Sequence, residues 1–170
     1  MERKVESFME LSTYQEACAL DFAIFTQTKS WPKEEMYALT DQIRRSSRSV
    51  GANIAEAWAK RRYPAHFTSK LTDADAELQE TLHWLMRAKE YGYIESKPFE
   101  ELWNAAKQVG RRLGSMLKSG DWSSLGHRQT VLSQRATVHC LPATSAAHSQ
   151  QAQPEPERAA DTEAGDSGHR

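Results

Sequence analysis

Apolar residues recur at alternating spacings of three and four along four successive stretches of the chain, and this periodicity constrains the fold more than any other feature. Such spacing places the side chains on one face of an α-helix. The second stretch shows it without interruption, with a seam at Met36, Leu39, Ile43, Ser47, Val50, Ile54 and Ala57. Residues 1–118 contain no run that alternates apolar and polar residues as a half-buried strand does. The sequence therefore predicts an all-α fold.

Capping and breaking residues mark the ends of the first two helices. Thr13 and Glu16 have the spacing of a capping box, so we expect the first helix to begin there and to run to about Lys29. Trp31-Pro32 ends it, because the residue before a proline avoids helical angles. The second helix follows directly, and Gly51 is a candidate bend within it.

The third and fourth helices also have recognisable ends. The third begins near Tyr63-Pro64, where proline is tolerated in the first turn, and Gly92 supplies its stop. Ser96 is the expected cap of the fourth helix. The predicted apolar faces are Phe67, Leu71, Ala74, Leu78, Leu82 and Leu85 in the third helix, and Phe99, Leu102, Trp103, Ala106, Val109, Gly110, Leu113, Met116 and Leu117 in the fourth.

Short links between four long helices favour an antiparallel up-down-up-down bundle. Trp31, Trp58, Trp84 and Tyr91 add apolar surface beside the predicted seams. Aromatic side chains are enriched at subunit contacts, so their presence predicts self-association. The alternative is that these rings only widen the apolar stripe of each helix inside the bundle.

The composition changes near Gly120 and divides the chain into two parts. Residues 1–118 carry the periodic apolar pattern and form the predicted bundle domain. Residues 119–170 are rich in Ser, Ala, Gln and Pro, and have too few large apolar residues to offset the chain entropy lost on folding. We expect this C-terminal tail to be largely disordered, with Trp122 and Leu125 as the residues able to pack on the end of the bundle.

Several features of the chain favour a cytoplasmic protein. Cys18 and Cys140 lie far apart and show no CxxC spacing, so reduced thiols are expected. The first ten residues contain no apolar run that would serve as a signal peptide. No run of about 18 apolar residues predicts a membrane span.

Basic residues gather on the second helix, at its end and on the fourth helix, and they are candidates for contacting the phosphates of RNA or DNA. They are Arg44, Arg45, Arg48, Lys60, Arg61, Arg62, Arg111 and Arg112, with Lys107 as a further contributor. Residues 1–118 contain 18 Lys and Arg against 17 Asp and Glu. The domain as a whole therefore lacks the basic excess that polyanion binders usually show.

Carboxylates of the third helix offer a different role for the first three of these arginines. Asp73, Glu77 and Glu80 share one stripe, and antiparallel packing would set them opposite the second helix of the same or a neighbouring subunit. Bidentate arginine-carboxylate pairs would then fix the packing register rather than bind RNA. The cluster at 60–62 has no acidic neighbour in sequence and remains the better nucleic-acid candidate.

Polar residues at the edges of the seams predict a structural network. Asn53 lies one residue from the seam of the second helix, and Asp75 has a similar position on the third. Half-buried polar groups must find partners, and Glu56 is a further carboxylate close to Asn53 in sequence. We expect these residues, with Asp73, Glu77 and Glu80 as further members, to select one packing register.

The pattern Glu80-Thr81-Leu82-His83 is half of the di-iron carboxylate signature of four-helix bundles. A working site needs a second copy of the pattern and two more glutamates. The sequence contains no second copy, and Glu56 is only one extra carboxylate. Glycine-rich phosphate loops, Ser-His-Asp sets and zinc-ligand spacings are also absent from the sequence. We therefore expect no metal, no cofactor and no enzymatic activity.

Several strings around the second helix resemble one bacterial protein family. They are QIRR at 42–45, SVGANIAEA at 49–57, RRYPAHF at 61–67 and SKL at 69–71, followed by the GYI turn at 92–94. Over about residues 10–118 the chain resembles the bacterial four helix bundle proteins. That family includes proteins encoded within intervening sequences of 23S ribosomal RNA genes and is related to the accessory variability protein of diversity-generating retroelements. Many members have proline at the position of Gly51 and glycine at that of Ala57.

The resemblance implies an up-and-down bundle, commonly a ring-like homopentamer, with no known enzymatic reaction. For the retroelement branch it implies basic surfaces that engage nucleic acid and a reverse transcriptase. We therefore predict a non-catalytic, cytoplasmic homo-oligomer that presents a basic rim to RNA or DNA. The alternative is a structural or protein-interaction module that binds no nucleic acid.

Overall fold

The computed structural model describes residues 5–119, which form four α-helices and three short 3-10 segments. The helices are α1 (Ser12–Gln27), α2 (Leu39–Ala59), α3 (Pro64–Glu90) and α4 (Ser96–Ser119). The 3-10 segment η1 (Phe8–Glu10) precedes α1, and η2 (Thr28–Ser30) and η3 (Lys33–Glu35) lie between α1 and α2. No strand occurs within residues 5–119, so the predicted all-α fold is confirmed. The predicted tail, with Trp122, Leu125 and Cys140, lies outside the described residues.

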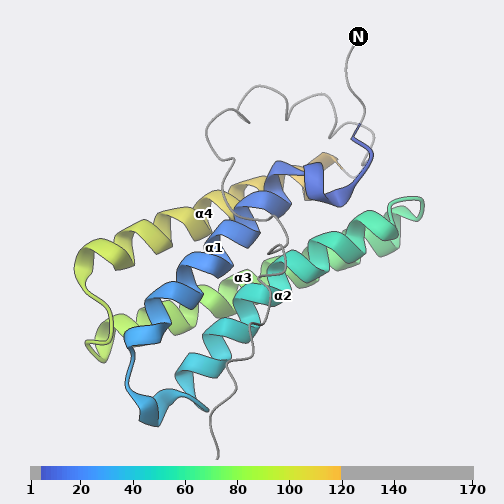
Figure 1. The fold of residues 1–170 in the computed structure, drawn as a ribbon. Coiled ribbons are helices and arrows are strands. Elements are labelled where there is room, and N and C mark those ends of the chain that lie inside the picture. Colours follow the sequence, from blue (N-terminus) through green and yellow to red (C-terminus); the bar gives the residue numbers. More distant parts are fainter. Residues whose placement is uncertain (1–4, 120–170) are drawn as a thin grey trace, which may run out of the picture. The chain divides into compact units, whose positions relative to one another are not determined.

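The four helices form an antiparallel bundle in which each helix packs on the next and α1 also packs on α4 (Figure 1). The turn between α2 and α3 lies at the end of the bundle where α1 begins and α4 ends. We call this the hairpin end. The α1–α2 and α3–α4 links lie at the opposite end, which we call the link end. None of the four helices combines the length and apolar composition needed to span a bilayer.

The predicted seams form the core of the bundle, because residues at spacings of three and four face the same neighbours. Met36 is an exception, since it is 48% exposed. The prediction was wrong there because α2 begins only at Leu39, whose N–H donates to Glu35 Oε2 at 3.1 Å. Five further residues of the predicted faces are half-buried rather than buried: Leu82, Phe99, Trp103, Gly110 and Leu117.

The predicted capping box at the start of α1 is also wrong. Leu11 is the N-cap, no side chain caps the helix, and the buried Thr13 hydroxyl has no hydrogen-bond partner among the described residues. The Glu16 side chain instead contacts Arg112 on α4. A contact between helices has therefore replaced the local cap.

The ends of α3 agree with the prediction. Pro64 is its first residue, and Gly92 has a φ of 75°, a left-handed conformation that glycine adopts without strain. The N–H of Tyr93 donates to the Ala88 carbonyl at 2.9 Å and that of Gly92 to the Lys89 carbonyl at 3.1 Å. These two bonds form a Schellman motif, which stops the helix.

The four aromatic residues beside the seams do not share one role. Trp31 and Trp58 are buried in the core of the described chain, so they widen its apolar stripe and are unavailable to a neighbouring subunit. Trp84 is half-buried and Tyr91 is exposed. The helix α2 continues without a break through Gly51, where a Cβ atom would lie 3.7 Å from Cε2 of Tyr14.

Candidate functional site

The predicted basic residues do not form one continuous surface. Arg44 and Lys60 are separated by about 24 Å along α2 at roughly 1.5 Å per residue. The arginines near the start of α2 and the cluster at 60–62 therefore lie at separate places on the bundle, and the pair at 111–112 lies on another helix, α4.

Two of the arginines near the start of α2 contact α1. The Nε of Arg44 donates to Thr28 Oγ1 at 2.7 Å, and its guanidinium lies 5.0 Å from the centroid of the Phe25 ring. The Nε of Arg48 lies 3.9 Å from Asp21 Oδ1. Both side chains therefore contribute to the packing of α2 on α1.

Asp21, the partner of Arg48 on α1, was not among the residues that the sequence indicated. Its Oδ1 accepts a hydrogen bond from Ser47 Oγ at 3.1 Å. Burial raises the pKa of Asp21 above its usual value, while the bond from Ser47 and the charge of Arg48 act in the opposite direction. The carboxylate thus joins two polar side chains of α2 to α1.

Within residues 5–119, the predicted pairing of these arginines with the α3 carboxylates is not formed. Arg45 lies 3.8 Å from Asp41, four residues earlier on its own helix, with both side chains exposed. Arg44 and Arg48 are directed to α1 rather than α3, as their contacts show. Burial and the nearby charge of Glu80 raise the pKa of Glu77, and Arg45 only opposes this rise.

Three members of the predicted polar network meet around a lysine that the sequence did not single out. The Lys70 Nζ lies 2.9 Å from Glu56 Oε2 and 3.2 Å from Asp73 Oδ2. It also donates to Asn53 Oδ1 at 3.3 Å. The hydrogen bond to Glu56 and, to a lesser extent, the one to Asp73 raise the pKa of Lys70. This cluster joins α2 to α3 near the hairpin end.

The other predicted members of the network have local partners. Asp75 Oδ1 accepts from Gln79 Nε2 at 3.5 Å, and Glu80 Oε1 accepts from Trp84 Nε1 at 3.0 Å. The His83 ring packs against Trp84, with ring centroids 4.8 Å apart. Within residues 5–119 no three His, Cys, Asp or Glu side chains are grouped closely enough to hold a metal ion.

The cluster at 60–62 lies in the turn at the hairpin end. The turn is closed by a hydrogen bond from the Tyr63 N–H to the Lys60 carbonyl at 2.9 Å. Lys60 and Arg62 are exposed. Arg61 has a structural contact, because its Nη1 donates to the Trp58 carbonyl at 2.8 Å and its guanidinium lies 4.4 Å from the Trp58 ring centroid.

The sequence around this turn contains basic residues and no acidic ones. Residues 57–72 contain four Lys and Arg residues and no Asp or Glu. Of these four, Lys70 is neutralised by Glu56 and Asp73. Lys60 and Arg62 are therefore the cations best placed to meet an anionic ligand.

Of the two predicted arginines of α4, one has a carboxylate partner and the other is exposed. The Nε of Arg112 lies 2.6 Å from Glu16 Oε2, and the two side chains are 23% and 22% exposed. Gln108 Nε2 also donates to Glu16 Oε1 at 3.1 Å. Arg112 thus joins α4 to α1, whereas Arg111 is exposed.

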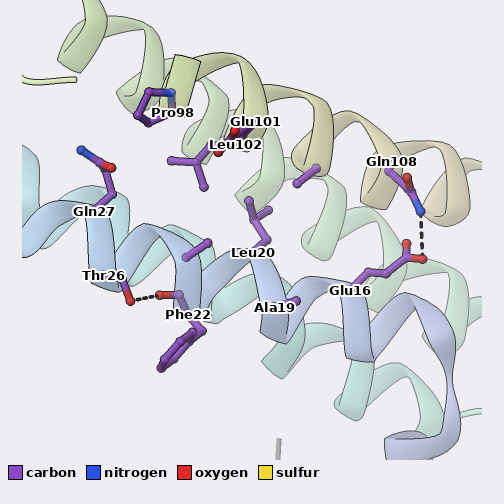
Figure 2. Close-up of a pocket in the computed structure, with 12 residues that line it drawn as sticks. Glu16, Ala19, Leu20, Phe22, Thr26, Gln27, Pro98, Glu101, Leu102 and Gln108 are labelled. Atoms are coloured by element: carbon purple, nitrogen blue, oxygen red, sulfur yellow. Dashed lines mark hydrogen bonds between the residues drawn. The ribbon is translucent and has the colours of Figure 1, made fainter. Parts of the chain in front are cut away.

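A groove of about 550 Å³ runs between α1 and α4, and no sequence argument predicted it. Figure 2 shows Leu20 and Leu102 pointing into the space between the two helices, with the Gln108–Glu16 hydrogen bond at one end. Alanines 19, 23 and 105 also line it. The Phe22 ring points away from α4 and is 54% exposed. In the sequence, the four-residue spacing of Ala19 and Ala23, which places two small side chains on one face of α1, was the feature that could have indicated this groove.

The chain is similar in sequence and fold to known proteins. A family model described as 23S rRNA-intervening sequence protein matches residues 9–115. A solved structure, of a protein with unknown function from the S23 ribosomal protein family of Bacteroides thetaiotaomicron, is 29% identical with a TM-score of 0.58. The match covers 62% of this chain and 95% of that one. No curated protein matches significantly. Since the family model matches more than half of the chain, this chain belongs to the 23S rRNA-intervening sequence protein family.

Proposed function

We propose that this chain is a non-catalytic, cytoplasmic homo-oligomer that binds RNA or DNA through the hairpin end of its bundle. The observation that carries the proposal is the stretch 57–72, which has four basic residues, no carboxylate and two exposed cations in the turn. Lysine and arginine side chains in such a setting contact phosphates and supply affinity that is independent of base sequence.

The side-chain contacts reduce the number of predicted basic residues that are available to bind phosphates. Arg44, Arg48 and Arg112 each have a packing partner on another helix, so we assign them to stability. Lys60 and Arg62 are assigned to phosphate binding. Arg111 is a further candidate on α4, because it is exposed.

The test removes the two exposed cations of the turn and keeps Arg61, which holds the end of α2. We expect the double variant Lys60→Ala/Arg62→Ala to bind an RNA hairpin and a DNA duplex more weakly. The slope of log affinity against log salt should become shallower by about 1.8 for the duplex, at roughly 0.9 per phosphate contact. Fluorescence anisotropy between about 50 and 200 mM salt measures both quantities.

The matched control is Lys33→Ala/Lys97→Ala, which removes the same charge from exposed positions at the link end. Its affinity and salt slope should equal those of the wild type. Equal losses in both double variants would contradict a site at the hairpin end. Absence of salt-dependent binding by the wild type at low ionic strength would contradict nucleic-acid binding and favour the protein-interaction module.

The groove between α1 and α4 supports the homo-oligomer, with a helix of a second copy as the proposed occupant. Its exposed alanine side chains are small enough to permit close approach of another helix, and docking of that helix would remove them from water. Light scattering on the wild type should give the mass of an oligomer, five copies by family resemblance. Ala19→Glu/Ala23→Glu should lower that mass.

The control for the groove is Ala52→Glu/Ala76→Glu, two exposed alanines on α2 and α3. It adds the same charge away from the groove and should leave the mass unchanged. A wild type that is monomeric at micromolar concentration would contradict self-association. An unchanged mass in the groove variant would contradict this interface.

The finer form of the proposal adds a reverse transcriptase as a protein partner, as in the retroelement branch of the related proteins. The genomic neighbourhood tests it. A variable repeat and a reverse transcriptase gene beside this gene would support the retroelement role. A position inside a 23S ribosomal RNA gene would contradict that role and support the intervening-sequence one.

A further inference from the structure

Among the described residues, Tyr63 is the most exposed aromatic side chain of the hairpin end, with 66% of its surface accessible. It is the N-cap of α3 and has extended backbone angles, φ −119° and ψ 94°. Pro64 follows and keeps residue 63 out of the helical conformation. The Tyr63 side chain therefore lies outside the seam of α3, in which Phe67 is the first buried aromatic.

The surroundings of Tyr63 leave its ring available. The His66 ring contacts it edge-on, with centroids 6.1 Å apart and an interplanar angle of 87°, so this contact is not a parallel stack. The hydrogen bond from the Tyr63 N–H to the Lys60 carbonyl places the ring in the same turn as Lys60 and Arg62. An exposed aromatic ring and two exposed cations thus lie within the four-residue segment 60–63.

An aromatic ring beside phosphate-binding cations fits one kind of ligand better than others. Unpaired bases of RNA or single-stranded DNA stack on aromatic side chains while the backbone follows nearby positive charges. Bases within a continuous duplex are already stacked on their neighbours and cannot reach such a ring without being extruded. A purely acidic peptide would use the cations and would not need the ring.

We propose that Tyr63 is a stacking platform for an unpaired base, so that the hairpin end recognises single-stranded nucleotides in loops or at ends. This inference rests on the proposed function of the hairpin end and names its substrate class. Lys60 and Arg62 contact the flanking phosphates, and Tyr63 contributes the preference for unpaired over paired nucleotides.

The test compares Tyr63→Leu with Tyr63→Phe, which keeps an aromatic ring. The probes are a single-stranded RNA that carries one 2-aminopurine, the same RNA annealed to its complement, and single-stranded DNA. We expect Tyr63→Leu to weaken binding to the single strands by roughly tenfold, with the salt slope and duplex affinity unchanged. Stacking quenches 2-aminopurine, so this quenching should be lost in Tyr63→Leu and retained in Tyr63→Phe.

The matched control is Tyr37→Leu, which removes a tyrosine that is 90% exposed at the link end, beside Glu34 and Glu35. Its binding should equal that of the wild type. Circular dichroism on each variant checks that the helices remain folded.

Two results would overturn the inference while leaving the proposed function in place. In one, Tyr63→Leu binds the single strands as tightly as the wild type and the Lys60/Arg62 variant still loses salt-dependent affinity. In the other, Tyr63→Leu loses single-strand and duplex affinity equally. If the wild type binds neither single strands nor duplex at low ionic strength, the proposed function fails and the stacking role fails with it.

Discussion

The Oγ1 of Thr81 on α3 lies 2.9 Å from the Oγ of Ser46 on α2, and both residues are buried. Each hydroxyl also has a local carbonyl within reach, Glu77 O at 2.8 Å from Thr81 and Ile43 O at 3.3 Å from Ser46. Two small polar groups therefore meet inside an otherwise apolar interface. Because buried polar groups need hydrogen-bond partners, this contact favours the helix register that brings the two oxygens together.

We expect Thr81→Val to destabilise the chain by about 1 kcal/mol, because Ser46 loses its partner across the interface while the volume is nearly kept. Ser46→Ala should cost a similar amount. The double variant should cost less than the sum of the two, since the bond between the two hydroxyls can be lost only once. Urea unfolding of the four proteins measures the coupling, and strictly additive costs would show that the two hydroxyls do not interact.

Arg112→Gln should lower the free energy of unfolding by about 1–3 kcal/mol, because it leaves the half-buried Glu16 carboxylate with the uncharged Gln108 amide as its partner on α4. Arg111→Gln removes the same charge from an exposed position and should stay within about 0.5 kcal/mol of the wild type. Chemical denaturation compares the two. Equal stability of both variants would show that the Arg112–Glu16 contact contributes nothing.

Gly92→Ala and Gly114→Ala should change stability in opposite directions. Gly92 has a φ of 75°, so alanine there is strained and should cost about 1 kcal/mol although no atom would contact its Cβ. Gly114 lies inside α4 with open space at its Cβ position, so alanine should stabilise by about 0.5–1 kcal/mol. Thermal unfolding gives both signs, and a stabilised Gly92→Ala would exclude the left-handed conformation.

Asp21→Asn should stabilise the chain at neutral pH. Burial raises the folded-state pKa of Asp21 above the usual 3.8, so the folded state binds this proton more readily than the unfolded state. The stability due to this group therefore falls as the pH rises from 3.8 through the raised pKa, and the ionised carboxylate is unfavourable above it. Asparagine keeps an acceptor for Ser47 without the charge.

Melting temperatures at neutral pH and near pH 3.8 test this expectation, because the advantage of asparagine should shrink at the lower pH. Asp41→Asn is the control, since Asp41 pairs with Arg45 at the surface. A variant that is less stable than the wild type at neutral pH would show that Arg48 and Ser47 outweigh the burial of Asp21.

The helices could be predicted because their evidence is local. Burial of one face imposes spacings of three and four, and Pro64 and Gly92 act on their own backbone. The start of α1 was not predictable in this way, because the partner of Glu16 is 96 residues away. Met36 was misplaced because a 3-10 segment delays the start of α2, although the apolar pattern continues through it.

The residues of the candidate site were likewise predictable only where the evidence is local in the sequence. The basic turn at 60–62 was recognisable because it needs no partner, only the absence of acidic neighbours along the chain. The partners of Arg44 and Lys70 depend on which faces of neighbouring helices meet. Charge alone did not distinguish Arg111 from Arg112, because only the packing of α4 on α1 brings one of them to a carboxylate.

The four-residue turn between α2 and α3 also has a consequence for the order of folding. Closing so short a loop costs little entropy, so the two helices meet early and can act as a nucleus. The contact between Glu16 and Arg112 joins residues 96 positions apart, and its loop closure is far more costly. We expect α1 and α4 to dock last, so that the basic turn is already formed while the rest of the bundle is still assembling.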